Sequence, residues 1–204
     1  MEAMQTPSGR YLPYLLPILF GLLHGTALAA SPPDGDGAVA VHGELKRWHA
    51  VTLELRGPYA SESDPAFNPF TDARMSVVFR HESGSPVYTV PGYFAADGRA
   101  AETSATAGTV WRAHLSPDKT GTWHYRVRFI KGLMSAIDPA AGLPLTPFDG
   151  QTGSFEVAET DKTSPDFRAR GRLAYLGDRY LRFLGDGTGF LKARSEEHTS
   201  ELQS

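Results

Sequence analysis

Carboxylates are the side chains of this sequence best suited to acid–base chemistry, which requires a positioned group within reach of the reacting atoms. Five Asp residues instead stand in polar stretches, mostly beside Gly, Pro or Ser: Asp64, Asp72, Asp97, Asp118 and Asp186. An Asp in such a stretch accepts hydrogen bonds from the backbone of its own turn. We therefore expect these carboxylates to form turns and not to serve as a catalytic pair.

The other residue types that support catalysis or metal binding form no recognisable pattern. Cys is absent, so the chain has neither a thiolate nucleophile nor a thiolate metal ligand. His114 and His124 are expected to face solvent on adjacent strands, but the His residues lack the spacing of a metal-binding pair. The glycines from Gly185 to Gly189 do not link a strand to a helix as a phosphate loop does. We predict no metal and no cofactor.

The composition is that of a folded protein rich in turns. Gly (21) and Pro (15) together argue against a helical bundle, and 41% hydrophobic residues argue against disorder. Lys and Arg number 20 against 23 Asp and Glu, and they are scattered along a chain of net charge -3. This distribution excludes nucleic acid as the expected partner.

The N-terminus predicts export from the cell. Residues 1–29 have the pattern of a signal peptide, because an apolar run from Leu12 to Leu23 precedes Ala27-Leu28-Ala29, a small-x-small cleavage pattern. Cleavage near Ala29 would make the protein secreted or periplasmic in a bacterium, with no membrane attachment. An uncleaved anchor is the alternative.

The C-terminus predicts a sequence artefact. Residues 194–204 read RSEEHTSELQS, which is the translation of a widely used sequencing-library adapter in one frame. We interpret this tail as adapter read-through, and expect the natural coding sequence to be cut after about Ala193.

Alternating apolar and polar residues predict a series of short strands. In the clearest, Trp123 to Phe129, apolar residues alternate with His124, Arg126 and Arg128, which gives one apolar and one cationic face. The others lie near Val39–Val41, Val51–Leu55, Met75–Phe79, Val87–Val90, Trp111–Leu115 and Phe155–Val157. Seven such strands predict an all-β, immunoglobulin-like antiparallel sandwich over residues 39–158. Residues 30–38 before it are expected to be disordered.

The composition changes again after the sandwich. Residues 159–166 are polar and are predicted to be a linker. Residues 167–193 then contain two strands around a Gly177-Asp178 turn and the beginning of a third. So few strands cannot bury a core alone. We interpret them as a short β-hairpin at the start of a larger, truncated catalytic domain.

Three motifs within the sandwich resemble a known family. They are Asn68-Pro-Phe70 with Asp72, then Val90-Pro-Gly-Tyr-Phe94 followed by Asp97-Gly98, then Trp111-Arg-x-x-x-Ser-Pro-Asp118-x-x-Gly121-x-Trp123-x-Tyr125. Over about residues 40–130 this combination resembles the domain of unknown function 5060. The resemblance implies an immunoglobulin-like N-terminal module of a secreted bacterial glycoside hydrolase, followed by a catalytic (β/α)8 barrel.

Under this resemblance the catalytic groups would lie in the barrel. Glycoside hydrolysis needs two carboxyl groups across the sugar, and a barrel supplies its catalytic groups from the ends of several strands. Residues 167–193 would reach only about the first of them. We therefore predict no catalytic residues and no hydrolase activity here, and an accessory module that packs against the barrel, its expected partner in the same protein.

Carbohydrate binding by the sandwich is the alternative function, with a polysaccharide as the partner. Aromatic rings offer flat apolar faces on which sugar rings stack. The candidates are Trp48, which is out of register with the strand after it, and Tyr59, Phe67 and Phe70 in the segment from Gly57 to Thr71. This alternative requires the rings to cluster at the surface. Trp111 and Trp123 share the parity of their apolar neighbours and are predicted to be core residues.

Overall fold

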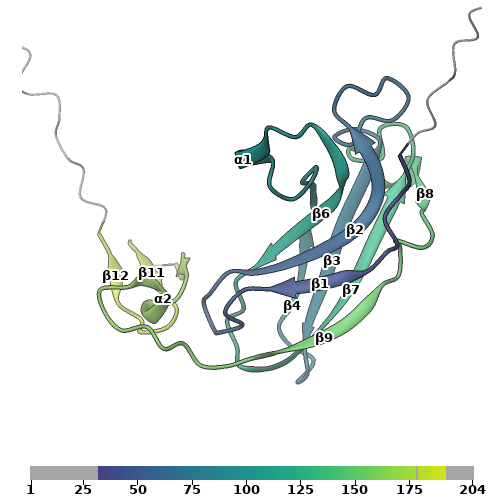
Figure 1. Ribbon diagram of the computed structural model, residues 1–204. Coiled ribbons are helices and arrows are strands. Elements are labelled where there is room, and N and C mark those ends of the chain that lie inside the picture. The colour runs from purple at the N-terminus through teal and green to yellow at the C-terminus, as the bar shows by residue number, and fades with distance from the viewer. Residues whose placement is uncertain (1–31, 178, 192–204) are drawn as a thin grey trace, which may run out of the picture. The chain divides into compact units, whose positions relative to one another are not determined.

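The computed structural model describes residues 32–177 and 179–191, and nearly all the regular structure in these ranges is β-strand (Figure 1). Nine strands of this part form two antiparallel sheets that face each other. The first sheet has the order β1 (Val39–His42), β2 (Val51–Ser61), β6 (Ala107–Leu115), β5 (Tyr93–Phe94). The second has the order β4 (Val87–Pro91), β3 (Ala73–His81), β7 (Gly121–Lys131), after which β8 (Leu143–Pro144) and β9 (Thr152–Val157) both pair with β7.

This strand order is that of an immunoglobulin-like sandwich. Strands β1, β2, β6 and β5 take the places of A, B, E and D, while β4, β3, β7 and β9 take those of C′, C, F and G. The prediction of an all-β antiparallel sandwich is confirmed, and each of the seven predicted strands is present. The added strands β5 and β8 have two residues each, too few to show a period-two pattern.

The alternation of side chains explains why these segments pair as they do. Along β7, Trp123, Tyr125, Val127 and Phe129 are buried between the sheets, and the alternate residues His124, Arg126 and Arg128 are exposed. The facing positions of β3 are buried in the same way, at Val77 and Phe79. A shift of one residue would move these apolar side chains into water, so burial fixes the register.

Aromatic rings join the two sheets in place of a disulfide. Trp111 of β6 meets Phe129 of β7 edge to face, with ring centroids 4.9 Å apart, and its Nε1 donates to the Pro58 carbonyl at 3.1 Å. The Nε1 of Trp123 donates to the Lys119 carbonyl at 2.9 Å. The prediction that both Trp residues belong to the core is confirmed.

Two local expectations differ from the structure. His114 lies on β6 and His124 on β7, which belong to opposite sheets, so the expected adjacent strands were wrong. The expected disorder of residues 30–38 also differs from the described part of that segment, because the Gly35 and Gly37 amides donate to carbonyls of Gly57 and Arg56.

Short helical turns connect some of the strands. They are α1 (Ala100–Thr103), the 3₁₀ turn η1 (Pro139–Ala141) and α2 (Phe167–Arg170). No helix of the described part of the chain is both long enough and apolar enough to cross a membrane. The predicted signal peptide and adapter tail lie outside the described residues.

A small three-stranded sheet follows α2. It consists of β10 (Leu173–Ala174), β11 (Leu181–Phe183) and β12 (Gly189–Phe190), at the positions that the turn pattern predicted. Its centre is Phe183, which stacks on Phe167 at 5.5 Å and meets Phe190 at 5.7 Å. We call residues 167–191 the C-terminal segment. That it begins a catalytic domain remains a prediction.

Candidate functional site

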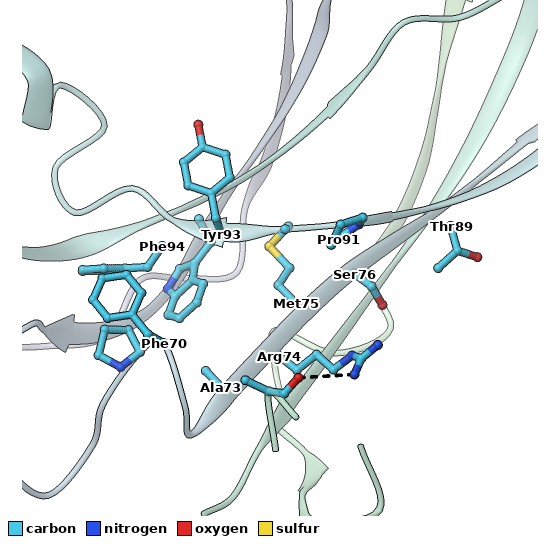
Figure 2. A pocket seen from close by; sticks show the side chains of 13 residues that line it. Phe70, Ala73, Arg74, Met75, Ser76, Thr89, Pro91, Tyr93 and Phe94 are labelled. Carbon is cyan, nitrogen blue, oxygen red and sulfur yellow. Dashed lines mark hydrogen bonds between the residues drawn. The ribbon is translucent and has the colours of Figure 1, made fainter. Parts of the chain in front are cut away.

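An aromatic hollow of about 420 Å³ lies between the loop before β3 and the β4–β5 connection (Figure 2). Phe70 and Phe94 lie beside each other at one end, with ring centroids 6.4 Å apart, and Met75 lies on the side towards Pro91. Tyr93 forms the rim, and its hydroxyl points away from Phe70. The polar wall consists of Arg74, Ser76 and Thr89.

A hydrogen-bonded turn holds Phe70 outward. The Asn68 side chain accepts from the Phe70 amide at 2.9 Å, and the Asp72 carboxylate accepts from the Asn68 amide at 3.2 Å. Asp72 also accepts from the Met134 amide at 3.1 Å, and these amide donors hold its pKa below the usual range. The Asn-Pro-Phe motif therefore builds a rigid turn with an exposed ring at its tip.

The Val-Pro-Gly-Tyr-Phe motif takes the chain from one sheet to the other. At Gly92 a Cβ atom would lie 2.8 Å from the Met75 side chain, so a side chain does not fit at this crossing. Tyr93 then faces outward, where its hydroxyl lies 2.9 Å from His114 Nε2, while Phe94 turns into the core. Sequence analysis missed Tyr93, although its parity opposite to Phe94 is a usable signal.

The third motif includes a residue that contacts the C-terminal segment. The Asp118 carboxylate accepts from the Tyr88 hydroxyl and, at 3.3 Å, from the Arg172 guanidinium. Arg172 also lies over the Tyr88 ring at 5.3 Å. Burial, and then the hydrogen bond to Asp118, raises the pKa of the Tyr88 phenol.

The four candidate sugar-binding rings do not lie together. Trp48 is 9% exposed and Phe67 is 7% exposed, whereas Phe70 is 58% exposed and Tyr59 is half-buried on β2. The expected exposure of Trp48 and Phe67 was wrong. Trp48 packs against Gly171, and Lys131 covers Phe67 with its ammonium 4.0 Å from the ring centroid. Trp48 precedes β2, whereas Tyr59 lies near the far end of that strand and Phe67 and Phe70 follow it. The condition that these rings cluster at the surface is therefore not met, and sugar binding stays a prediction that depends on Phe70, the exposed ring of the four.

The part of the chain that contains the three motifs matches a known family. Residues 44–130 match the model of a family described as Domain of unknown function (DUF5060). The chain carries a DUF5060 domain. The resemblance predicted from the three motifs is thereby confirmed, and the match runs from the loop before β2 to the end of β7.

The comparisons with curated proteins and with solved structures give less information about this chain. No curated protein matches the chain. A crystal structure described as that of "a putative glycoside hydrolase from Bacteroides vulgatus ATCC 8482" is 21% identical, with a TM-score of 0.44. The match covers 71% of this chain and 20% of that one, so the chain spans about a fifth of the length of that protein.

One cluster, which joins the start of the DUF5060 match to the segment after β9, has the residue types of a metal site. The ligand atoms of Glu44, His49 and Asp161 lie within 4.8 Å of one another. However, Lys46 lies 2.6 Å from Asp161 and Lys162 lies 3.6 Å from Glu44. The Lys46 ammonium lowers the pKa of Asp161 to about 2. The carboxylates thus already have cationic partners, and the cluster is an ion-pair network.

Proposed function

We propose that this chain is a non-catalytic N-terminal accessory module of a secreted or periplasmic carbohydrate-active enzyme. In this proposal it packs against, and supports, a catalytic (β/α)8 barrel of glycoside hydrolase type that continues from the C-terminal segment. The observation that carries the proposal is the way this segment is attached. Specific contacts hold it to the DUF5060 domain, yet most of its apolar side chains remain exposed.

The attachment uses side chains from three places. Arg172 binds Asp118 and the Tyr88 hydroxyl, the latter at 3.1 Å. Gly171 lies so close to Trp48 that a Cβ atom would be 2.8 Å from the indole ring. Arg168 lies 3.6 Å from Glu44. Together these contacts favour a fixed position of the segment on the sandwich.

The same segment leaves a large apolar surface in solvent. Leu173, Tyr175, Leu176, Tyr180, Leu181 and Leu191 are all exposed. Three short strands cannot cover these side chains by themselves, and such a density of exposed apolar groups is typical of an interface. The larger domain predicted from the sequence is the partner we propose for this surface.

The carboxylates of the described residues favour a non-catalytic role. Asp64, Asp97 and Asp186 accept hydrogen bonds from backbone amides two residues ahead of them, and Asp72 closes its own turn. They perform the turn-forming role expected of them.

The test uses the complete protein encoded by the genomic locus, with the natural sequence that follows residue 193. Calorimetry should give one cooperative unfolding transition, and Arg172→Ala should lower its midpoint and separate a second transition. Arg99→Ala is the control, because Arg99 is likewise an exposed arginine but belongs to the β5–β6 connection. Independent unfolding of sandwich and barrel in the wild type would contradict the proposal.

Sugar binding is a second candidate function, favoured by the exposure of Phe70 at 58% and Tyr93 at 45% beside a polar wall. If the hollow binds glycan, the chain should be retained on an insoluble polysaccharide and Phe70→Ala should release it. The matched control is Phe167→Ala, an equally exposed ring in the C-terminal segment. Equal loss with both variants, or no retention on any polysaccharide, would argue against this function.

A further inference from the structure

The outer face of the second sheet carries a row of cations that neither proposed role uses. Arg126 and Arg128 are exposed on β7, two residues apart, and Arg80 of β3 lies opposite His124. In this register Arg126 faces Val78, and Arg128 faces Ser76. Successive outward positions of a strand lie roughly 7 Å apart. We call Arg80, His124, Arg126 and Arg128 the arginine row.

In the described part of the chain, no carboxylate forms an ion pair with the guanidinium groups of this row. Within residues 32–177 and 179–191, no ion pair involves Arg80, Arg126 or Arg128, whereas Arg56, Arg112 and Arg172 each have an acidic partner. Asp149 borders the row, but its side chain already accepts from the Phe129 amide at 2.8 Å. Neighbouring like charges on one sheet face repel each other. In a chain of net charge -3 this row is therefore a local excess of positive charge.

The row borders a hollow with an apolar floor. The hollow measures about 540 Å³ and is lined by Val78, Ile130 and Pro144 beside the arginine row. It lies next to the aromatic hollow, because Ile130 pairs across the strands with Arg74, and Arg128 pairs with Ser76. Arg74 and Ser76 belong to the wall of the aromatic hollow (Figure 2). Arg74 and Ser76 thus connect the aromatic hollow to the apolar floor and to the arginine row.

We infer that this face binds an anionic polysaccharide, that is, a sugar polymer bearing repeated carboxylate or sulfate groups. The planar guanidinium fork binds such groups with two parallel hydrogen bonds. The apolar floor suits the C–H faces of the sugar rings, and repeated anions match repeated cations along β7. The inference rests on the proposed function, because it names the polymer class on which the parent enzyme would be positioned.

Affinity electrophoresis of the purified full chain tests this inference. Separate native gels contain polygalacturonate, carrageenan, an uncharged galactan or single-stranded DNA, so that carboxylate, sulfate, neutral and nucleic-acid polymers are compared. The inference expects retardation by at least one of the two acidic polysaccharides and none by the galactan. Added salt should weaken the binding, since the charges are exposed.

Two variants locate the binding. Arg126→Gln and Arg128→Gln should each raise the Kd for the retarding polymer about tenfold, as expected for a lost charge-assisted hydrogen bond. Arg99→Gln, on a loop away from this face, should leave the Kd unchanged. All three positions are exposed, so we expect none of the substitutions to unfold the protein. Unchanged unfolding temperatures would verify that folding is intact.

Each contrary result is informative. No retardation by either acidic polymer, equal weakening by Arg99→Gln, or binding of DNA as tight as that of the polysaccharide would overturn the inference. Retardation by the neutral galactan that Phe70→Ala abolishes and Arg126→Gln leaves intact would also overturn it, while supporting sugar binding in the aromatic hollow. Docking of a barrel is measured separately by calorimetry.

Discussion

Replacement of Trp111 gives the most direct test of how this sandwich is stabilised without a disulfide. The side chain is 1% exposed and touches Phe129 of the other sheet and Phe94 of its own, with centroids at 4.9 and 5.2 Å. Its Nε1 donates to the Pro58 carbonyl. It therefore combines contacts between the sheets with a hydrogen bond to β2.

The expected cost follows from these contacts. Trp111→Ala leaves a cavity at the centre of the core, and such truncations cost about 3–5 kcal/mol. Trp111→Phe keeps a ring against Phe129 but leaves the Pro58 carbonyl without its donor, which costs about 1–3 kcal/mol. Since domains of this size unfold at about 5–15 kcal/mol, the Ala variant should be close to unfolded and the Phe variant should remain folded.

Urea denaturation followed by circular dichroism measures both free energies of unfolding. Tyr175→Ala is the control, because Tyr175 is exposed and its loss should change stability by at most about 0.5 kcal/mol. The reasoning fails if Trp111→Ala costs less than about 1 kcal/mol. It also fails if the Phe variant loses as much as the Ala variant, because the ring contacts would then contribute nothing.

Two further predictions concern packing and pH. Gly92→Ala should lower the free energy of unfolding by about 1–3 kcal/mol, because the added Cβ atom would press on Met75. Gly189→Ala is the control in the same urea titration and should change this free energy little, because a Cβ atom there meets nothing within 4 Å. Equal effects of the two substitutions would contradict the steric explanation. Asp161 has a pKa lowered from 3.8 to about 2, first by the Lys46 hydrogen bond, so its contribution is present above pH 3.8 and lost as the pH falls towards 2. Lys46→Met should therefore reduce the fall in unfolding temperature across that interval, and an unchanged fall would exclude this ion pair as its cause.

The strands were predictable from sequence because burial on one face leaves a period of two in the residue pattern, as in β7. The burial of Trp48 and Phe67 could not be predicted from the sequence, because the groups that cover them, Gly171 and Lys131, come from distant parts of the chain. A pattern read along one strand carries no information about such neighbours. Part of the arginine row was visible in the sequence as the cationic face of β7. The register with β3 shows in addition that Arg80 joins it. That no carboxylate within the described residues pairs with its guanidinium groups could be seen only in the structure.

The three DUF5060 motifs differ in what their residues do, and Asp118 is the informative exception. Asn68 and Asp72 close a turn, Gly92 permits a crossing, and Trp111 fills the core, so each is explained by the sandwich alone. Asp118 instead directs its carboxylate to Tyr88 and to Arg172 of the C-terminal segment. The hydrogen bond from Tyr88 lies within the sandwich, whereas the contact with Arg172 reaches the segment that follows it. A carboxylate within a motif of the domain that binds the segment after it favours a module built to hold its neighbour in place.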